Sequence, residues 1–267
     1  MTYFNKNAEL KNGYNAYIDA NTDDMGTQMD VGLLLMEDGD VFTFNEADKE
    51  IAVLLFAGKV TYEWDGKKVE ADRPDCFHHE AYCLLAGKGT KITLTAHAHS
   101  ELYIQKTINE KPYEAVMYTP DTVQTQYAGG KGELMGCMER EIKTFFDLDN
   151  APFSNMVLGE VLNRPGKWSS YPPHHHPQPE VYFYRFDYPD GFGAGFANGE
   201  IFKTGHNGLA VINHGFHSQT AAPGYAMCYA WGIRHLDGDP WDKTRIDDEE
   251  HEWLWKADAN DHIYPNH

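Results

Sequence analysis

The side chains best suited to chemistry cluster in the second half of the chain. His174 and His176 are two residues apart, so on an extended strand both side chains point to the same face. Glu180 follows across a short turn broken by prolines, and His217, preceded by Gly215, would arrive from a different strand. Neutral imidazole is the commonest metal ligand, and histidines with one carboxylate suit a catalytic ion that keeps open positions. The pattern predicts one divalent metal ion bound by His174, His176, Glu180 and His217, with zinc as first choice and manganese or iron(II) as alternatives.

Other histidines fit this site less well. His175 lies between two of the predicted ligands and should face the opposite side of its strand. His206 and His214 lie near His217 in the sequence but lack its turn context. The first half of the chain has two more histidine pairs, His97 with His99 and the adjacent His78 and His79. We interpret both pairs as polar residues that bind no metal.

Three tyrosines are candidates for moving a proton. Tyr182 and Tyr184 share strand parity with Glu180, so they should point into the same interior, and Tyr229 could do so from a later strand. A phenol in such a position can act as a general acid or base. Aromatic residues on a strand are nevertheless more often core than catalytic.

The elements that must position these residues are strands. Short runs rich in β-branched and aromatic residues recur, separated by turn signals such as Ala57-Gly58 and Asp65-Gly66, and the second of these predicts a hairpin. Little helical periodicity lies between the runs, so we expect an all-β protein made of sandwiches or barrels. The succession of strand-like runs and turns is interrupted once and then resumes. This predicts two tandem domains, with residues 1–117 forming a first domain without metal, 118–131 a linker, and 132–267 a metal-binding domain with a surface tail.

Composition narrows the partners and the compartment. The chain has 267 residues and a net charge of −19, which argues against nucleic acid or an anionic membrane as partner, since both require a positive surface. An acidic substrate would need local lysine or arginine against that field. The four cysteines show no regular spacing, and neither a leader nor an apolar run of about 20 residues is evident. We therefore expect a cytoplasmic protein with free thiols.

The order His-x-His, Glu, Gly-x-His resembles that of the cupin superfamily, with departures in the glycine spacings and at Asn213, where a proline is usual. A closer resemblance is to the 5-deoxy-glucuronate isomerases of myo-inositol catabolism. It is carried by four stretches: residues 166–174, 180–185, 222–225 and 251–254. Residues 180–184 also resemble the related ketol-isomerases of unsaturated-uronate breakdown. The loop between His176 and Glu180 is shorter than in the inositol family, which affects the expected substrate pocket more than the metal site.

The resemblance implies a bicupin, two tandem jelly-roll barrels of which the second holds the metal and the first is mainly structural. It also implies an aldose–ketose isomerisation of 5-deoxy-glucuronate to 2-deoxy-5-keto-gluconate, with a 4-deoxy-5-keto-uronate ketol-isomerase as the alternative. Arg185, Lys203 and Arg234 are candidates for holding the substrate carboxylate, although the strand parity of Arg185 favours a structural ion pair. Two other classes stay open, a metal-dependent cupin dioxygenase and a non-catalytic sugar-acid-binding cupin. A homo-oligomer is the default expectation, because sheet edges are often covered by another subunit.

Overall fold

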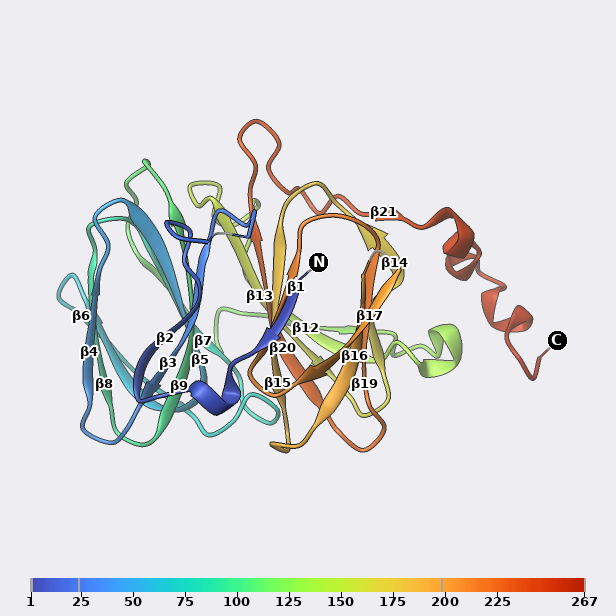
Figure 1. Ribbon diagram of the computed structural model, residues 1–267, viewed down its shortest axis with the longest axis horizontal. Helices are drawn as coiled ribbons and strands as arrows, with labels where there is room; N and C mark the ends of the chain where they lie inside the picture. The colour runs from blue at the N-terminus through green and yellow to red at the C-terminus, as the bar shows by residue number, and fades with distance from the viewer. Residues whose placement is uncertain (1, 24, 198, 267) are drawn as a thin grey trace.

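A computed structural model describes residues 2–23, 25–197 and 199–266 of the chain. The fold is all-β, as predicted, and consists of two β-barrels side by side (Figure 1). Within the described residues the helical segments are four short 3₁₀ helices, which are η1 (Asn7–Glu9), η2 (Glu133–Gly136), η3 (Glu249–Trp255) and η4 (Ala259–His262). None of the described helices has the length and apolar character that a membrane crossing requires.

The first barrel is a single curled sheet of nine strands. Its path runs β10-β7-β5-β9-β3-β2, while β8 pairs with β4 and β5, and β6 pairs with β5. The strands are β2 (Gly13–Ile18), β3 (Asp30–Met36), β4 (Val41–Asn45), β5 (Lys49–Trp64), β6 (Lys67–Arg73), β7 (Tyr82–Ala86), β8 (Lys91–Ala96), β9 (Ser100–Ile108) and β10 (Val116–Tyr118).

Strand β5 corrects one prediction and the hairpin after it confirms another. Ala57-Gly58 is a bend within one continuous strand of 16 residues, not a turn between two strands. The register with β9 shifts between Leu55 and Ala57, and Gly58 has φ +116°, where an added Cβ would lie 2.2 Å from the Ser100 hydroxyl oxygen. The glycine lets the strand bend and continue from one side of the barrel to the other. The predicted hairpin is present, because Asp65-Gly66 joins β5 to β6 with positive φ at both residues.

The second barrel is built from two sheets that face each other. One has the order β1-β18-β15-β20-β13-β12-β11 and the other β17-β16-β19-β14-β21. The strands are β1 (Thr2–Asn5), β11 (Thr125–Ala128), β12 (Arg140–Phe146), β13 (Met156–Asn163), β14 (Trp168–His175), β15 (Glu180–Phe186), β16 (Phe192–Ala197), β17 (Glu200–Gly205), β18 (Gly208–Ile212), β19 (His217–Ala221), β20 (Met227–Arg234) and β21 (Ile246–Asp247).

Two strands lie outside the expected division of the chain. β1, at the N-terminal end, pairs antiparallel with β18 and so belongs to the sheet of the second barrel. β11 lies inside the stretch expected as a linker, 118–131, and pairs with β12. Both elements join the chain's first and middle segments to the sheet that carries much of the second barrel. The division into 1–117 and 132–267 as separate folding units stays a prediction.

Three apolar clusters hold the molecule together. One fills the first barrel, one lies inside the second, and the largest lies between them with residues from both, such as Leu54, Tyr103, Leu158 and Phe183. A buried ion pair crosses the same interface, with the Arg73 guanidinium 2.7 and 2.9 Å from the two carboxylate oxygens of Glu160. The shared core joins the barrels into one body.

Candidate metal centre

Three strands from both sheets of the second barrel bring the predicted ligands together. β14 carries His174 and leads into His176, β19 begins at His217, and β15 begins at Glu180 in the opposite sheet. His174 is the direct cross-strand partner of His217. The ligands therefore come from both of the facing sheets, whose strands β14, β15 and β19 are labelled in Figure 1.

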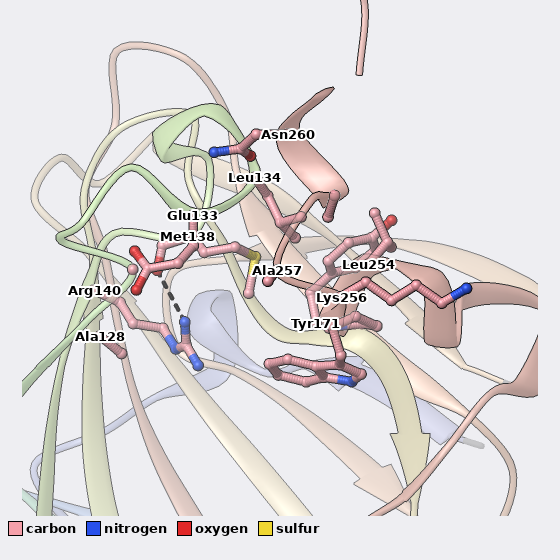
Figure 2. A pocket seen from close by; sticks show the side chains of 14 residues that line it. Ala128, Glu133, Leu134, Met138, Arg140, Tyr171, Leu254, Lys256, Ala257 and Asn260 are labelled. Atoms are coloured by element: carbon pink, nitrogen blue, oxygen red, sulfur yellow. Dashed lines mark hydrogen bonds between the residues drawn. The ribbon is translucent and has the colours of Figure 1, made fainter. Parts of the chain in front are cut away.

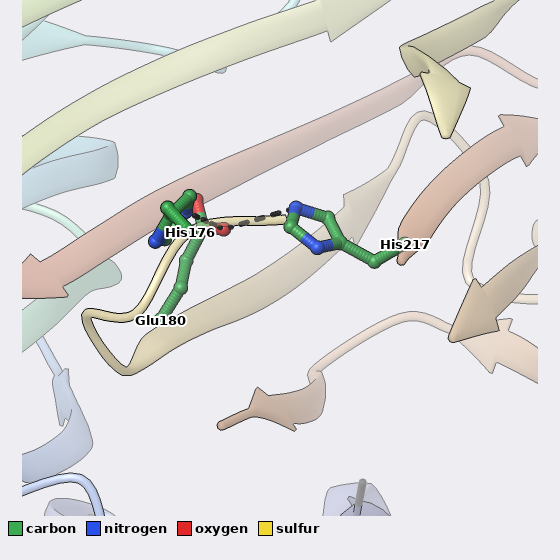
Figure 3. Close-up of side chains that lie close together, drawn as sticks. All are labelled: His176, Glu180 and His217. Carbon is green, nitrogen blue, oxygen red and sulfur yellow. Dashed lines mark hydrogen bonds and ion pairs between the residues drawn. The ribbon is translucent and has the colours of Figure 1, made fainter. Parts of the chain in front are cut away.

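His176, Glu180 and His217 form a compact buried cluster (Figure 3). The Nε2 atoms of His176 and His217 each lie 3.3 Å from Oε2 of Glu180. One ligand atom from each residue lies within 4.8 Å of the others, and among the residues that the structure describes this is the one such group of three or more. The predicted decoys in the first barrel do not form one.

His174 stands at the edge of this cluster. Its ring centroid is 4.4 Å from that of His217 and 6.4 Å from that of His176. Its Nδ1 lies 3.2 Å from the carbonyl oxygen of Ser170. A carbonyl oxygen can only accept, so Nδ1 carries the hydrogen and Nε2 keeps its lone pair, the arrangement that outer hydrogen bonds impose on metal-binding histidines.

The protonation states suit a cation. Burial alone would raise the pKa of the Glu180 carboxyl, but hydrogen bonds from His176 and His217 hold that pKa well below its usual range. Burial, with the neighbouring His217 and Arg245, places the pKa of His174 well below its usual value. An ionised carboxylate and a neutral imidazole are the forms in which these side chains bind metals.

The donor set fits a divalent ion. Nδ1 of His176 and Nδ1 of His217 are buried without a hydrogen-bond partner among the described residues, and both rings approach Glu180 through Nε2 instead. A buried polar atom without a hydrogen-bond partner is energetically unfavourable unless a bound ion or ligand satisfies the site. Imidazole nitrogens with one carboxylate suit zinc, iron(II) or manganese, and the geometry does not choose among them.

A layer of three tyrosines lies next to the cluster, as their strand parity predicts. Tyr182 donates a hydrogen bond to Oε2 of Glu180 at 3.0 Å, and its Oη lies 3.1 Å from Oγ of Ser170. Tyr229 donates to Oγ of Ser169 at 3.1 Å, whereas the hydroxyl of Tyr184 has no partner among the described residues. Burial raises the pKa of all three phenols, so at neutral pH each keeps its proton and can donate it.

Two adjacent serines reach the tyrosines because β14 is irregular. Ser170 has φ +52°, and the pairing of β14 with β19 shifts register between Ser169 and His174. In a regular strand neighbouring side chains point to opposite faces, so only one serine could face the interior. The irregularity allows Ser169 to contact Tyr229 and Ser170 to contact Tyr182.

The three predicted substrate cations have partners elsewhere. Arg185 forms an ion pair with Glu101 of the first barrel at 2.5 Å, as its parity suggested. Lys203 is exposed, with Nζ 4.7 Å from the centroid of the Phe192 ring. Arg234 donates to Oγ1 of Thr107 at 2.9 Å, again across the interface between the barrels. That these three residues bind the substrate carboxylate stays a prediction, and no contact among the described residues supports it.

Two other arginines, which the sequence did not single out, lie near Pro172 of β14. Arg245 donates to the carbonyl of Pro172 at 2.5 Å and pairs with Asp247 at 2.6 Å. Arg140 begins β12 and lines a cavity of about 340 Å³, together with Tyr171 and Pro172 of β14 and with Trp255. Figure 2 shows this cavity between Arg140 and residues of the C-terminal segment. The sequence held one signal for Arg140. It lies two residues before Ile142, so on a strand its side chain shares a face with that apolar residue.

Comparisons with known proteins agree on the family and the fold. The model of the KduI/IolB family matches residues 3–254. A curated 5-deoxy-glucuronate isomerase from Geobacillus thermodenitrificans is 23% identical over 230 residues, which are 79% of this chain and 80% of that protein. The crystal structure of an IolB-like protein from Salmonella typhimurium superposes with a TM-score of 0.81 at 18% identity, covering 92% of this chain and 96% of that one.

A second structure places the fold more broadly. A cupin 2 conserved barrel domain protein from Leptotrichia buccalis matches with a TM-score of 0.53 at 12% identity, over 87% of this chain and 96% of that one. At such identities the likeness concerns the fold alone. It confirms the cupin architecture expected from the histidine and glutamate pattern.

Proposed function

The chain belongs to the KduI/IolB family and is an isomerase, and from this premise we propose that it converts 5-deoxy-glucuronate to 2-deoxy-5-keto-gluconate in myo-inositol catabolism. The observation that carries the proposal is the buried cluster of His176, Glu180 and His217 with a protonated Tyr182 hydrogen-bonded to it. An aldose–ketose isomerase must hold a carbonyl and its neighbouring hydroxyl and must move a proton between adjacent carbons. The second barrel offers groups for both tasks.

His176, Glu180 and His217 would hold the metal, with His174 as the fourth ligand. A bound divalent ion, for which zinc is our first choice, supplies Lewis acidity toward the two substrate oxygens. No change of oxidation state is required for this reaction. The ionised carboxylate of Glu180 and the neutral imidazole of His174 described above are the forms in which these side chains bind such an ion.

The tyrosines would handle the proton. Tyr182 holds a hydrogen between Glu180 and Ser170, so it can give a proton to a substrate oxygen and recover one through the serine. Tyr229, bonded to Ser169, and Tyr184 complete an aromatic wall inside the barrel. Their rings exclude water from the reacting carbons, which favours a controlled proton transfer.

Proton NMR of 5-deoxy-glucuronate in D₂O tests the proposal. With the protein present, we expect the aldehyde-hydrate signals to disappear and ketose signals to grow, and a chelator should abolish the change until metal is returned. Deuterium in the new hydroxymethyl group would indicate an enediol route over a hydride shift. Tyr182→Phe should slow turnover by about 10²-fold or more while metal content stays the same. No turnover by a metal-loaded sample would refute this substrate.

A second substrate should be tested in the same assay, because residues 180–184 also resemble the ketol-isomerases of unsaturated-uronate breakdown. A 4-deoxy-5-keto-uronate presents the same carbonyl and hydroxyl pair on another sugar acid. Turnover of that compound and not of 5-deoxy-glucuronate would assign the protein the uronate ketol-isomerase activity. Turnover that requires O₂ would instead indicate the dioxygenase, and binding without turnover of either acid would indicate a sugar-acid-binding cupin.

A further inference from the structure

The cavity beside β14 deepens the proposed function, on which this inference rests. 5-Deoxy-glucuronate carries its carboxylate at the opposite end of the carbon chain from its aldehyde, so a second binding group is needed away from the metal. We infer that Arg140 binds the substrate carboxylate, in the cavity of about 340 Å³ that β12, β14 and the C-terminal segment enclose. In a protein of net charge −19, such a local cation is required to hold an acid.

Strand parity directs Arg140 into the second barrel. Ile142, two residues further along β12, packs against the apolar cluster inside that barrel, so Arg140 projects to the same face. The cross-strand partner of Arg140 is Asn163, whose Nδ2 donates to Oγ of Ser169 at 3.0 Å. The guanidinium thus enters on the side of the barrel where Ser169 contacts Tyr229.

Arg140 lacks an anionic partner of its own. Its Nη1 donates to the carbonyl of Met138 at 2.9 Å, and among the described residues no carboxylate oxygen lies within 4 Å of it. Arg245 differs, since it pairs with Asp247 and its guanidinium carbon lies 5.3 Å from the centroid of a Trp255 ring. A half-buried cation without a counterion is unfavourable, and a bound carboxylate would satisfy it through two parallel hydrogen bonds.

The cavity and the metal ligands share one strand, β14. Tyr171 and Pro172 line it, and His174 follows two residues later on β14. Asn163, the cross-strand partner of Arg140, and Tyr229 both donate a hydrogen bond to Ser169, which places Arg140 on the side of the barrel that holds the layer of tyrosines. A six-carbon acid held at Arg140 would therefore extend its reactive end toward Tyr182 and the cluster. Arg185, Lys203 and Arg234 contact neither this cavity nor the tyrosines in the described structure.

A charge-removing variant with a matched control tests the inference. Arg140→Gln should lower kcat/KM for 5-deoxy-glucuronate by about 10²-fold, chiefly through KM, and Arg140→Lys should recover part of the loss. Arg164→Gln, which removes an exposed arginine 4.0 Å from Glu141, should leave kcat/KM unchanged. With the neutral analogue in which a hydroxymethyl group replaces the carboxylate, Arg140→Gln should act like the wild type. An equal loss on both substrates would overturn the assignment, because it would show a general structural defect.

Binding of D-gluconate by calorimetry separates this inference from the proposed function, because gluconate has no aldehyde to isomerise. We expect the wild type and Arg164→Gln to bind it equally and Arg140→Gln to bind at least about 10-fold more weakly. That result in a protein without isomerase activity would uphold the sugar-acid subsite and refute the proposed reaction. Equal gluconate binding by Arg140→Gln in an active isomerase would overturn the role of Arg140 alone.

Discussion

The two barrels share an architecture and differ in what fills them. The interior of the first is packed with aliphatic and aromatic side chains such as Leu34, Leu55 and Ile104. The interior of the second contains Tyr182, Tyr184 and Tyr229 together with the ionisable cluster. In the first barrel, burial of apolar surface is the main gain, whereas the second holds polar atoms that a closely packed core would exclude. The same fold can thus serve as a support or as a site.

The histidine pairs make the difference concrete. His97 and His99 have the same spacing as His174 and His176, but they lie in the turn between β8 and β9 and their side chains are exposed. Nε2 of His97 lies 2.7 Å from Oγ1 of Thr61, and Nδ1 of His99 lies 2.9 Å from Glu37. The His-x-His spacing alone therefore does not make a metal centre. The pair must also border the interior, where a third ligand arrives from the opposite sheet.

The strongest test of this contrast substitutes one residue of the buried cluster and, as a control, one exposed histidine of the first barrel. Glu180→Gln should lose bound divalent metal and reduce kcat/KM by about 10³-fold or more, because several kcal/mol of charge stabilisation are removed. His99→Gln in the first barrel should change neither. Metal analysis after dialysis and turnover of 5-deoxy-glucuronate measure both effects. Retention of metal and rate by Glu180→Gln would mean that the centre lies elsewhere.

The second test separates support from activity. Glu160→Gln leaves the fully buried guanidinium of Arg73 without its counterion, so we expect a loss of about 3–5 kcal/mol in the free energy of unfolding. The turnover per folded molecule should stay near the wild-type value. Lys68→Gln, which breaks an exposed pair at 4.0 Å with Glu63, is the control and should change stability by less than about 0.5 kcal/mol. Urea unfolding measures both, and a similar result for the two variants would contradict the structural role of the interface pair.

The third test compares the two interiors directly. Leu55→Ala in the first barrel should destabilise the protein by about 2–5 kcal/mol through a cavity in a closely packed core. Tyr184→Phe in the second removes a buried hydroxyl that has no partner among the described residues, so stability should rise by up to about 1 kcal/mol. Thermal and urea unfolding give the two values. A large loss for Tyr184→Phe would show that its hydroxyl has a structural partner.

The smallest expected effect concerns acid sensitivity, which we assign to the second barrel. His235 is buried and accepts a hydrogen bond at Nδ1 from the backbone N–H of Trp241, and burial with the neighbouring Arg234 lowers its pKa from 6.5 to about 4. Between those values the unfolded chain takes up a proton that the folded protein refuses. Stability should thus fall as the pH drops from about 6.5 toward 4 and stay level above it.

His235→Asn keeps an acceptor near Nδ1 but removes the titration. Between pH 7 and 5 its free energy of unfolding should decline less than that of the wild type, by on the order of 1 kcal/mol. Among the described residues of the first barrel no histidine is buried, so substituting His78 there should leave the pH dependence unchanged. Parallel curves for wild type and His235→Asn would contradict this account.

The features that sequence predicted are those encoded over short distances. The spacing of His174 and His176, the parity of Tyr182 with Glu180, and the Asp65-Gly66 hairpin all depend on residues close together in the chain. Strand alternation and turn chemistry act at that range, and for this reason the all-β class could also be predicted. The compact cluster of His176, Glu180 and His217 needed one long-range step, for which the turn signal at Gly215 before His217 was the local indication.

The features that sequence missed depend on distant pairing. Arg140 and Arg245 are more than about 100 residues apart, and only the closed barrel brings both beside β14. The continuity of β5 depends on Ser100, which approaches Gly58 from another strand. Arg234 carries a plausible charge for a substrate, yet Thr107 of the other barrel engages it. Local periodicity contains no information on such partners.

The position of β1 has a consequence for how the protein is made. Thr2 pairs with Val211, so β1 can take its place in the sheet only after about 200 further residues have been synthesised. At cellular rates of elongation that interval is roughly 10–40 s. During this time the first barrel can close, whereas β1 stays unpaired until β18 has been synthesised. The order of synthesis therefore makes the first barrel available as a support before the second barrel can close.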